Sequence, residues 1–337
     1  GAKAKIDGLL AQKPENADAL FMKGTLLAMD GDAASALTHY QKAIAANPNF
    51  LPAYTATIFS LLQGNKMDEA VKQLEALKKI APKNPQSYFL DAQVNYQRKE
   101  FKAARESAQQ LLRFSPNNPN SLQIAGAIEY QLGSYLQAET YLAKALQGSP
   151  NLLLARRLLI ANYLRAGKPA KALETLEPVL GQIDKDSTFL TLAGQAYLQN
   201  GEANKAAEYF AKASKLDPEN TNKKTSLAIA HLAQGNTEGG FQELQQISAE
   251  DKGIMADLAL VTAHLKNNQL DKALQAIDVL EKKQPDNPAT HNLRARALLA
   301  KKDVVGARKS FDKALSINPT FFPAVASLAA LDLADKK

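Results

Sequence analysis

Residues 187–220 read STFLTLAGQAYLQNGEANKAAEYFAKASKLDPEN. On each side of Gly201 lies a run of about a dozen residues with apolar side chains at helical spacing. Gly201 is typical of the end of a helix, and Pro218 cannot continue a second one. The stretch therefore predicts two short antiparallel helices, which we name helix A and helix B.

The same arrangement recurs at intervals of 34 residues along the 337-residue chain. Prolines mark the intervals at Pro14, Pro48, Pro82, Pro116, Pro150, Pro218 and, after a one-residue slip, Pro285 and Pro319, whereas Asp184 and Lys252 stand at the two remaining marks. Twelve residues before the marks lie the small residues Ala36, Ala70, Ala104, Ala138, Ala172, Ala206, Gly240, Ala273 and Ala307. Seventeen residues before them lie the turn residues Gly31, Asn65, Lys99, Gly133, Gly167, Gly201, Gly235, Asn268 and Lys302. A fixed period of this kind is the signature of a repeat architecture.

Each repeat has the signals of one helix pair. Asn84-Pro85, Asn118-Pro119 and Asn287-Pro288 each combine a capping residue with a proline suited to the first helical position, which predicts the start of helix A. The small residue is expected on helix B at the point where helix A approaches it closely. A single pair is too small to fold alone, so it is expected to bury its remaining apolar face on the next pair.

This order of small residue, turn, alanine, aromatic residue, alanine and proline resembles the tetratricopeptide repeat. The residues that carry the resemblance best are Gly24, Gly31, Ala36, Tyr40, Ala43 and Pro48 in the first full repeat and Gly194, Tyr197, Gly201, Ala206, Phe210, Ala213 and Pro218 in the sixth. The resemblance extends over nearly the whole chain. It implies an all-α, right-handed superhelical solenoid of antiparallel helix pairs.

The period divides the chain into about nine full repeats with a partial one at each end. The repeats are expected at 17–50, 51–84, 85–118, 119–152, 153–186, 187–220, 221–253, 254–287 and 288–321. Residues 1–16 are expected to form a lone helix B, and residues 322–337 a lone helix A. The last helix is apolar, and the chain begins with Gly1 in place of methionine, so we expect a piece of a longer protein that continues on both sides.

Several function classes lack support in the residues. The chain has no cysteine, which excludes disulfides and zinc–thiolate sites. Its net charge of +7 is spread out without a basic block, so no nucleic-acid partner is expected. The chain contains no run of 18 apolar residues, so the sequence predicts no membrane-spanning helix. Signatures of catalysis and phosphate binding are also absent, and we expect a non-catalytic protein without a cofactor.

Two histidines, His231 and His264, occupy the same position in successive repeats. A metal site between them is conceivable, but no carboxylate recurs beside both, and packing between helices is the favoured interpretation.

The candidate binding residues follow from the resemblance. In the family, positions 2, 5, 9, 12 and 13 of helix A line the concave surface. The predicted site residues are Phe89, Gln93, Tyr96, Gln97, Gln123, Tyr130, Arg157, Arg165, Gln195 and Gln199, and Asn120, Gln131, Asn292 and Arg296 occupy further positions of the same set. Amides, tyrosines and arginines suit an extended peptide or a sugar chain. The alternative is a solvated polar surface without a ligand.

In composition and junctions, the repeats most resemble those of the bacterial tetratricopeptide lipoprotein associated with PEP-CTERM and exosortase systems. The features behind this are alanine- and leucine-rich B helices and the Pro-x-Asn-Pro junctions at 82–85, 116–119 and 285–288. The resemblance implies an interaction scaffold on the periplasmic side of the cell envelope, serving surface-protein or exopolysaccharide export, with a lipid anchor outside this sequence. Direct polysaccharide binding and a cytoplasmic adaptor remain alternatives, and the sequence does not name the partner.

Overall fold

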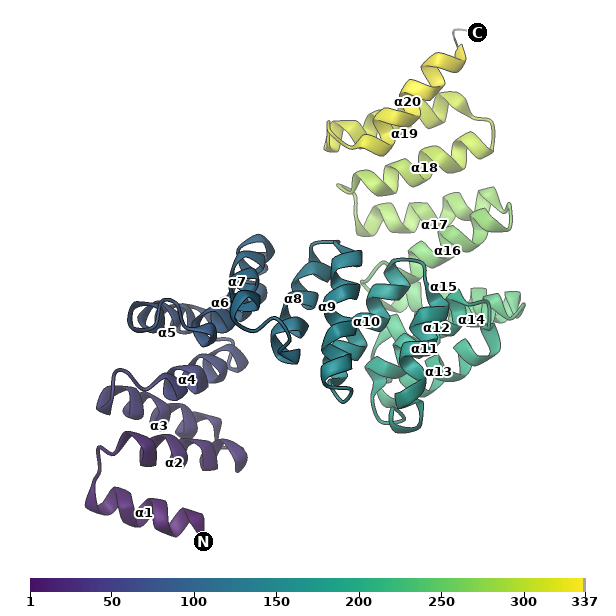
Figure 1. Ribbon diagram of the computed structural model, residues 1–337. Coiled ribbons are helices and arrows are strands. Elements are labelled where there is room, and N and C mark those ends of the chain that lie inside the picture. The colour runs from purple at the N-terminus through teal and green to yellow at the C-terminus, as the bar shows by residue number, and fades with distance from the viewer. Residues whose placement is uncertain (336–337) are drawn as a thin grey trace. The chain divides into compact units, whose positions relative to one another are not determined.

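The computed structural model describes residues 1–335, and over this range the chain forms helices and no strand. The all-α fold predicted from the sequence is confirmed. The chain forms two compact units, 1–168 and from Pro169 onward (Figure 1). The first unit contains α1 (Ala2–Gln12), α2 (Ala17–Met29), α3 (Ala33–Ala46), α4 (Leu51–Gln63), α5 (Met67–Ile80), α6 (Pro85–Gln97), α7 (Phe101–Phe114), α8 (Pro119–Gln131), α9 (Tyr135–Gly148) and α10 (Leu153–Arg165). The second contains α11 (Pro169–Leu176), the 3₁₀ helix η1 (Glu177–Gln182), α12 (Ser187–Gln199), α13 (Ala203–Leu216), α14 (Thr221–Ala233), α15 (Thr237–Glu250), α16 (Met255–Lys266), α17 (Leu270–Lys283), α18 (Pro288–Ala300), α19 (Val304–Ile317) and α20 (Phe322–Asp335).

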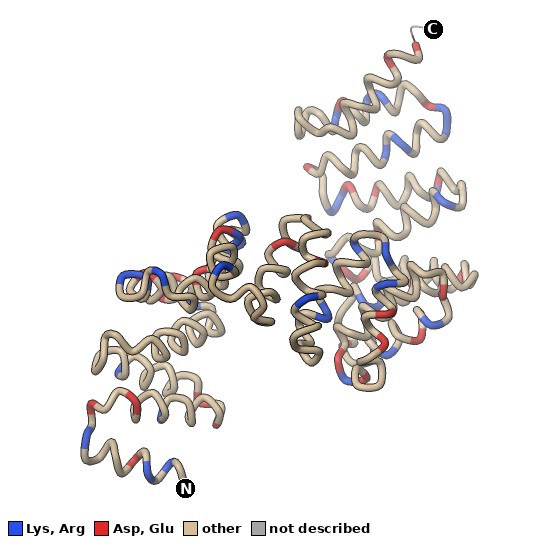
Figure 2. Tube along the Cα trace, in the orientation of Figure 1, with Lys and Arg blue, Asp and Glu red and all other residues tan. Residues whose placement is uncertain are grey.

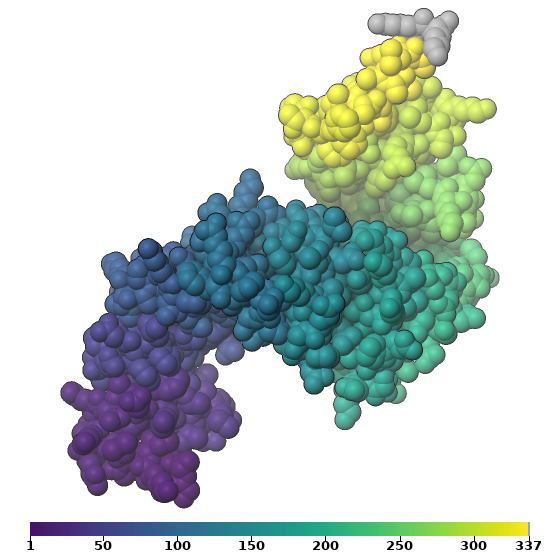
Figure 3. Space-filling view, viewed as in Figure 1, coloured from purple at the N-terminus to yellow at the C-terminus, as the bar shows by residue number. Residues whose placement is uncertain are grey.

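Within each unit, helix A of a repeat packs against helix B of the same repeat and the B helix packs against the next pair. The pairs are α2 with α3, α4 with α5, α6 with α7 and α8 with α9 in the first unit, and α12 with α13, α14 with α15, α16 with α17 and α18 with α19 in the second. Successive pairs of a unit adjoin in the space-filling view (Figure 3). The arrangement agrees with about nine repeats.

The turn between helix A and helix B has the same backbone conformation in all nine repeats. The turn residues with positive φ are Gly31, Asn65, Lys99, Gly133, Gly167, Gly201, Gly235, Asn268 and Lys302. Gly201 shows the geometry: its N–H donates to Leu198 O at 3.1 Å, and the next N–H, of Glu202, donates to Tyr197 O at 2.8 Å. These bonds satisfy carbonyls at the end of helix A and reverse the chain. The turn role predicted for these positions is confirmed.

Small residues let the two helices of a pair approach closely. A Cβ atom added to Gly24 of α2 would lie 2.7 Å from the Tyr40 ring and 3.0 Å from the carbonyl oxygen of Ala36, both on α3. The corresponding atom on Gly194 would lie 2.6 Å from the Phe210 ring. The predicted small positions of helix B, Ala36 included, are buried.

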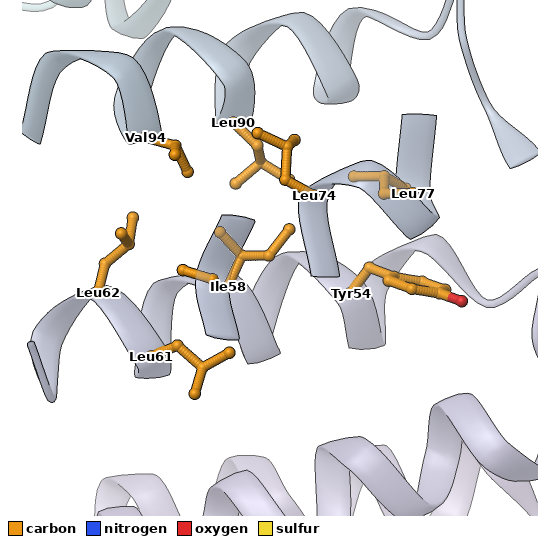
Figure 4. Close-up of a cluster of buried hydrophobic side chains, with 9 residues drawn as sticks. Tyr54, Ile58, Leu61, Leu62, Leu74, Leu77, Leu90 and Val94 are labelled. Atoms are coloured by element: carbon orange, nitrogen blue, oxygen red, sulfur yellow. The ribbon is translucent and has the colours of Figure 1, made fainter. Parts of the chain in front are cut away.

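The core of the first unit shows how consecutive pairs join. Side chains of α4, α5 and α6 converge in one apolar cluster (Figure 4). Its most buried members include Ile58 from α4, Leu77 from α5 and Leu90 and Val94 from α6. Burying an aliphatic side chain of this size contributes about 1.5–3 kcal/mol, so each pair depends on the following one for much of its stability.

Helix B of the fifth repeat departs from the regular pattern. Its α-helical part, α11, ends at Leu176, and the 3₁₀ helix η1 with Pro178 in its first turn follows. Proline has no N–H to donate and clashes with the carbonyl four residues earlier, which disfavours a continued α-helix. Val179 and Ile183 are nevertheless buried, so the segment still contributes to the core.

The close approach of helices gives a stability prediction for the second unit. Ala206 on α13 is fully buried, and we expect Ala206→Leu to lower the free energy of unfolding by about 1–3 kcal/mol through overpacking. Ala170→Leu, at an exposed position of α11, should have a much smaller effect. Denaturant midpoints of the two variants measure the difference, and equal midpoints would contradict the assignment.

Candidate functional site

We call positions 2, 5, 9, 12 and 13 of the A helices the A face. In the first unit, Phe89, Gln93, Tyr96, Gln123, Tyr130 and Arg157 are half-buried, whereas Gln97 and Arg165 are exposed. In the second unit, Gln195 is half-buried and Gln199 is exposed. The predicted site residues are therefore surface or partly buried residues, and whether they bind a partner stays a prediction.

A repeated contact connects neighbouring A helices of the first unit at the turn end of the A face. Gln131 Nε2 donates a hydrogen bond to Tyr96 Oη at 3.2 Å. One repeat later, the guanidinium carbon of Arg165 lies 5.8 Å from the centre of the Tyr130 ring. Both contacts join position 12 of one repeat to position 13 of the next, so the structure brings these four predicted residues together in two pairs.

Aromatic packing fixes the two tyrosines. Tyr96 packs edge-on against Phe101 at 5.6 Å between ring centres, and Tyr130 lies 6.2 Å from Tyr135. Hydrogen bonding to Tyr130, and then to Tyr135, raises the pKa of Arg165. This part of the A face is an ordered surface of phenol hydroxyls, amides and one cation.

Two further polar groups beside the A face of the first unit are buried. The Oε1 atom of Gln123 is buried and forms no hydrogen bond with any described residue, which leaves an acceptor unused on position 5. Arg156, which the sequence did not single out, is buried beside the predicted Arg157 and donates to the Pro150 carbonyl oxygen at 2.9 Å. Burial lowers the pKa of Arg156, and its contact holds the linker before α10.

The second unit has a different A face, which forms an apolar groove. A hollow of about 500 Å³ lies over α14 and α16 and is also bordered by the start of α15. Its lining residues are Ile229, Leu232, Ala233, Thr237, Met255, Leu258, Ala259, Thr262, Ala263, Lys266 and Asn267. Six of them, Ile229, Leu232, Ala233, Met255, Leu258 and Thr262, are A-face positions, and Lys266 is a seventh. The sequence prediction concentrated on polar residues of repeats three to six and missed this groove, although its apolar side chains stand at the same repeat positions.

The junction between α15 and α16, which precedes the groove-lining helix α16, is irregular. Repeat seven is one residue short, Lys252 stands at the proline mark, and α16 begins at Met255 after a bend at 252–254. The Lys283 ammonium, from α17, donates to the carbonyl oxygens of Ser248 at 2.7 Å and Asp251 at 2.9 Å, and to Asp257 Oδ2 at 2.7 Å. Lys283 thereby joins the end of α15 to the first turn of α16.

Further hydrogen bonds complete the junction. The Ser248 hydroxyl donates to the other carboxylate oxygen of Asp257, whose side chain is 1% exposed. A hydrogen bond from the Gly253 backbone, followed by one from the Thr221 hydroxyl at 2.9 Å, lowers the pKa of Asp251. The junction is therefore held by polar contacts in place of the usual proline.

The two histidines have different partners. His231 Nδ1 lies 2.9 Å from Glu243 Oε2, a carboxylate on α15 that sequence reasoning did not connect with it. His264 is buried, stacks on Phe241 at 4.2 Å between ring centres and hydrogen-bonds Gln269 Oε1 at 2.8 Å. These contacts agree with packing roles. Among residues 1–335, no group of three or more His, Cys, Asp or Glu side chains is placed to hold a metal ion.

Comparison with known families agrees with the helix-pair geometry. A tetratricopeptide-repeat family matches residues 27–94, 129–196 and 197–257, which together exceed half of the chain. The chain belongs to the tetratricopeptide-repeat family. A second family of tetratricopeptide repeats matches residues 1–49 and 258–320. Tetratricopeptide-repeat proteins act as protein-interaction scaffolds, and their fold is typically non-catalytic. No curated protein sequence matches the chain.

Solved structures of other tetratricopeptide proteins have the same fold. A tetratricopeptide repeat protein from Parabacteroides merdae is 17% identical, with a TM-score of 0.53 over 68% of this chain and 91% of that one. The human IFIT1 dimer with m7Gppp-AAAA is 16% identical, with a TM-score of 0.57 over 95% of this chain and 82% of that one. The type IV pilus biogenesis factor PilW is 19% identical, with a TM-score of 0.53 over 58% and 91%. At these identities the likeness shows the fold alone.

Charge on this tetratricopeptide protein is mixed in sign. Basic and acidic residues are interspersed along the trace of both units (Figure 2), and several form exposed ion pairs such as Lys205–Glu202 at 2.7 Å. Such pairs contribute little to stability. None of the described helices has the length and apolar character needed to cross a lipid bilayer.

The junction beside the groove gives a second prediction. Lys283→Met removes the cation that pairs with the buried Asp257 carboxylate, and we expect it to lower the free energy of unfolding by about 3 kcal/mol. The neighbouring Lys282 is exposed, and Lys282→Met serves as the matched control. Chemical denaturation measures both variants. A Lys283→Met protein as stable as the control would show that the junction does not depend on this ion pair.

Proposed function

We propose that this chain is a non-catalytic scaffold that binds segments of partner proteins on its A face, with the groove over α14 and α16 as the principal site. The observation that carries the proposal is the hollow of about 500 Å³ lined by apolar A-face side chains. Its volume lies within the range of specific ligand sites. Met255 and Leu258 are each more than a third exposed at this place. Covering such side chains is favourable and supplies a driving force for association.

The A face of the first unit supports a second contact of a different kind. The amides of Gln93 and Gln97, one half-buried and one exposed, and the hydroxyl of Tyr96 can exchange hydrogen bonds with an extended backbone. Polysaccharide binding, in contrast, depends on open aromatic faces. Tyr96 and Tyr130 pack on Phe101, Tyr135 and Arg165, which favours protein over sugar as the partner.

We further propose that the partner belongs to a bacterial envelope export or assembly system, with the chain on the periplasmic side. The support is the resemblance of its alanine- and leucine-rich repeats and Pro-x-Asn-Pro junctions to the PEP-CTERM-associated lipoprotein. Fractionation of the native cell tests this directly. Recovery of the protein in the envelope fraction is the expected result, and recovery in the cytosol would favour the adaptor alternative.

The binding proposal is tested by cross-linking in the native cell, followed by affinity measurements with the purified partner. We expect Arg157→Ala combined with Arg165→Ala to weaken binding of a partner that contacts the first unit by about 1–3 kcal/mol, the range of a modest hot spot. Lys102→Ala, on helix B, provides an exposed basic control.

Two outcomes separate the possibilities. Unchanged affinity in a folded double variant would remove the arginines from the binding surface. Binding of purified envelope polysaccharide with the same dependence on these arginines would favour direct polysaccharide binding over the scaffold.

A further inference from the structure

We infer that the groove over α14 and α16 receives an amphipathic α-helix of a partner protein that carries acidic residues beside its apolar stripe. This inference rests on the proposed function and specifies the conformation and charge of the bound segment. Three features of the second unit support it: the small number of hydrogen-bonding groups in the groove, its length, and the charge of the surrounding A face.

The groove offers few partners for a peptide backbone. Most of its lining side chains are apolar, and its side-chain polar groups are the hydroxyls of Thr237 and Thr262 and, at the end of α16, Lys266 and Asn267. The Thr262 hydroxyl already donates to the Leu258 carbonyl of its own helix at 2.8 Å, and the Thr237 hydroxyl to the Gly235 carbonyl at 3.4 Å. An extended segment placed along the apolar part of the groove would bury N–H and C=O groups without partners, and each such group weakens binding. A helix satisfies its own backbone and presents only side chains.

The dimensions also suit a helix. The lining of α16 runs from Met255 to Asn267, which at about 1.5 Å per residue corresponds to roughly 18 Å. A partner helix of about twelve residues has the same length and three turns. An apolar stripe at i, i+3, i+4 and i+7 on that helix would cover the exposed Met255 and Leu258.

The charge of the surrounding A face indicates which residues should flank the apolar stripe of the partner helix. The A-face positions of α14, α16 and α18 include two cations, Lys266 and Arg296, and no carboxylate. Both cations are exposed, and neither forms an ion pair with a residue in the described range. Lys266 borders the groove itself, at the end of α16. Electrostatic complementarity therefore favours Glu or Asp at the edge of the partner's apolar stripe.

The experiment uses the full chain and a fluorescein-labelled 14-residue peptide designed as an amphipathic helix, with leucines at i, i+3, i+4 and i+7 and glutamates at the edge of the stripe. Fluorescence anisotropy measures affinity, and circular dichroism measures peptide helicity on binding. We expect saturable binding with a gain of helicity. The same peptide with its two central polar residues replaced by proline should bind about tenfold more weakly or not at all.

Protein variants locate the peptide. Leu258→Glu places a charge in the groove and should weaken binding about tenfold. Leu136→Glu, at a leucine that is 76% exposed on α9, is the matched control and should bind as the unchanged protein does. Lys266→Glu should weaken binding about threefold, and a peptide with lysines in place of the glutamates should recover the loss.

Several results would overturn the inference: equal binding of the proline peptide, equal binding to folded Leu258→Glu, or no helicity gain. Sedimentation velocity distinguishes a second copy as occupant, because self-association lost in Leu258→Glu would show that the groove is an interface between identical chains. Different outcomes distinguish a failure of this inference from a failure of the proposed function. If a cross-linked partner loses affinity for Leu258→Glu but the helical peptide does not bind, the inference is wrong and the scaffold function stands. If no partner responds to Leu258→Glu, both are wrong.

Discussion

The close approach of helix A and helix B within a repeat is the constraint on which the rest of the structure depends. Where Gly24, Gly126 and Gly194 lie on helix A, a Cβ atom would come within 2.7 Å of a large side chain on helix B. The absence of side chains there allows Tyr40, Leu142 and Phe210 to be buried between the helices. Interiors packed at this density leave no room for an added methyl group. The spacing of the pair in turn sets where the next A helix lies, and therefore the geometry of the A face.

The linkers between repeats rely on a second recurrent interaction. A polar side chain near the start of helix A bonds a carbonyl oxygen six residues earlier, as in Ser87 to Ala81 at 2.7 Å, Arg156 to Pro150 at 2.9 Å and His291 to Pro285 at 3.0 Å. These bonds satisfy carbonyl groups that the end of helix B or the linker would leave unpaired. At the shortened junction after repeat seven, Lys283 performs this task from the following helix B. At this junction, a lysine side chain in place of a residue near the start of helix A therefore pairs the carbonyl groups at the end of helix B.

The two units present different chemistry at equivalent repeat positions. The first unit has amides and tyrosines there, some already joined by contacts such as Gln131 to Tyr96. The second unit has Ile229, Leu232 and Leu258, which form an apolar groove. On the proposed function, these two surfaces would favour a hydrogen-bonding extended segment and a segment that satisfies its own backbone, respectively. Fold and binding preference are separate properties, because the same helix pair accepts either set of side chains on its A face.

The sequence by itself determined the helices, the turns and the pairing. Positions such as Gly201, Ala206 and Pro218 are restricted by backbone conformation or close packing, and these restrictions act within a single repeat and recur with the period. The 3₁₀ segment that contains Pro178 was not predicted from the sequence, and neither was the burial of Val179 within it and of Ile183 just after it.

The candidate site was only partly accessible from sequence. The repeat positions predicted which residues share the A face, but not that Tyr130 would contact Arg165 or that the side chains over α14 and α16 would leave a hollow. Those features depend on the distance between neighbouring helices and on where side chains from different repeats end. Lys283 shows the same limit, since its hydrogen bonds to the carbonyl oxygens of Ser248 and Asp251 reach from repeat eight to repeat seven and follow no periodic rule. Tertiary structure decided these contacts because each arises where separate repeats meet, and the period describes only what each repeat contains.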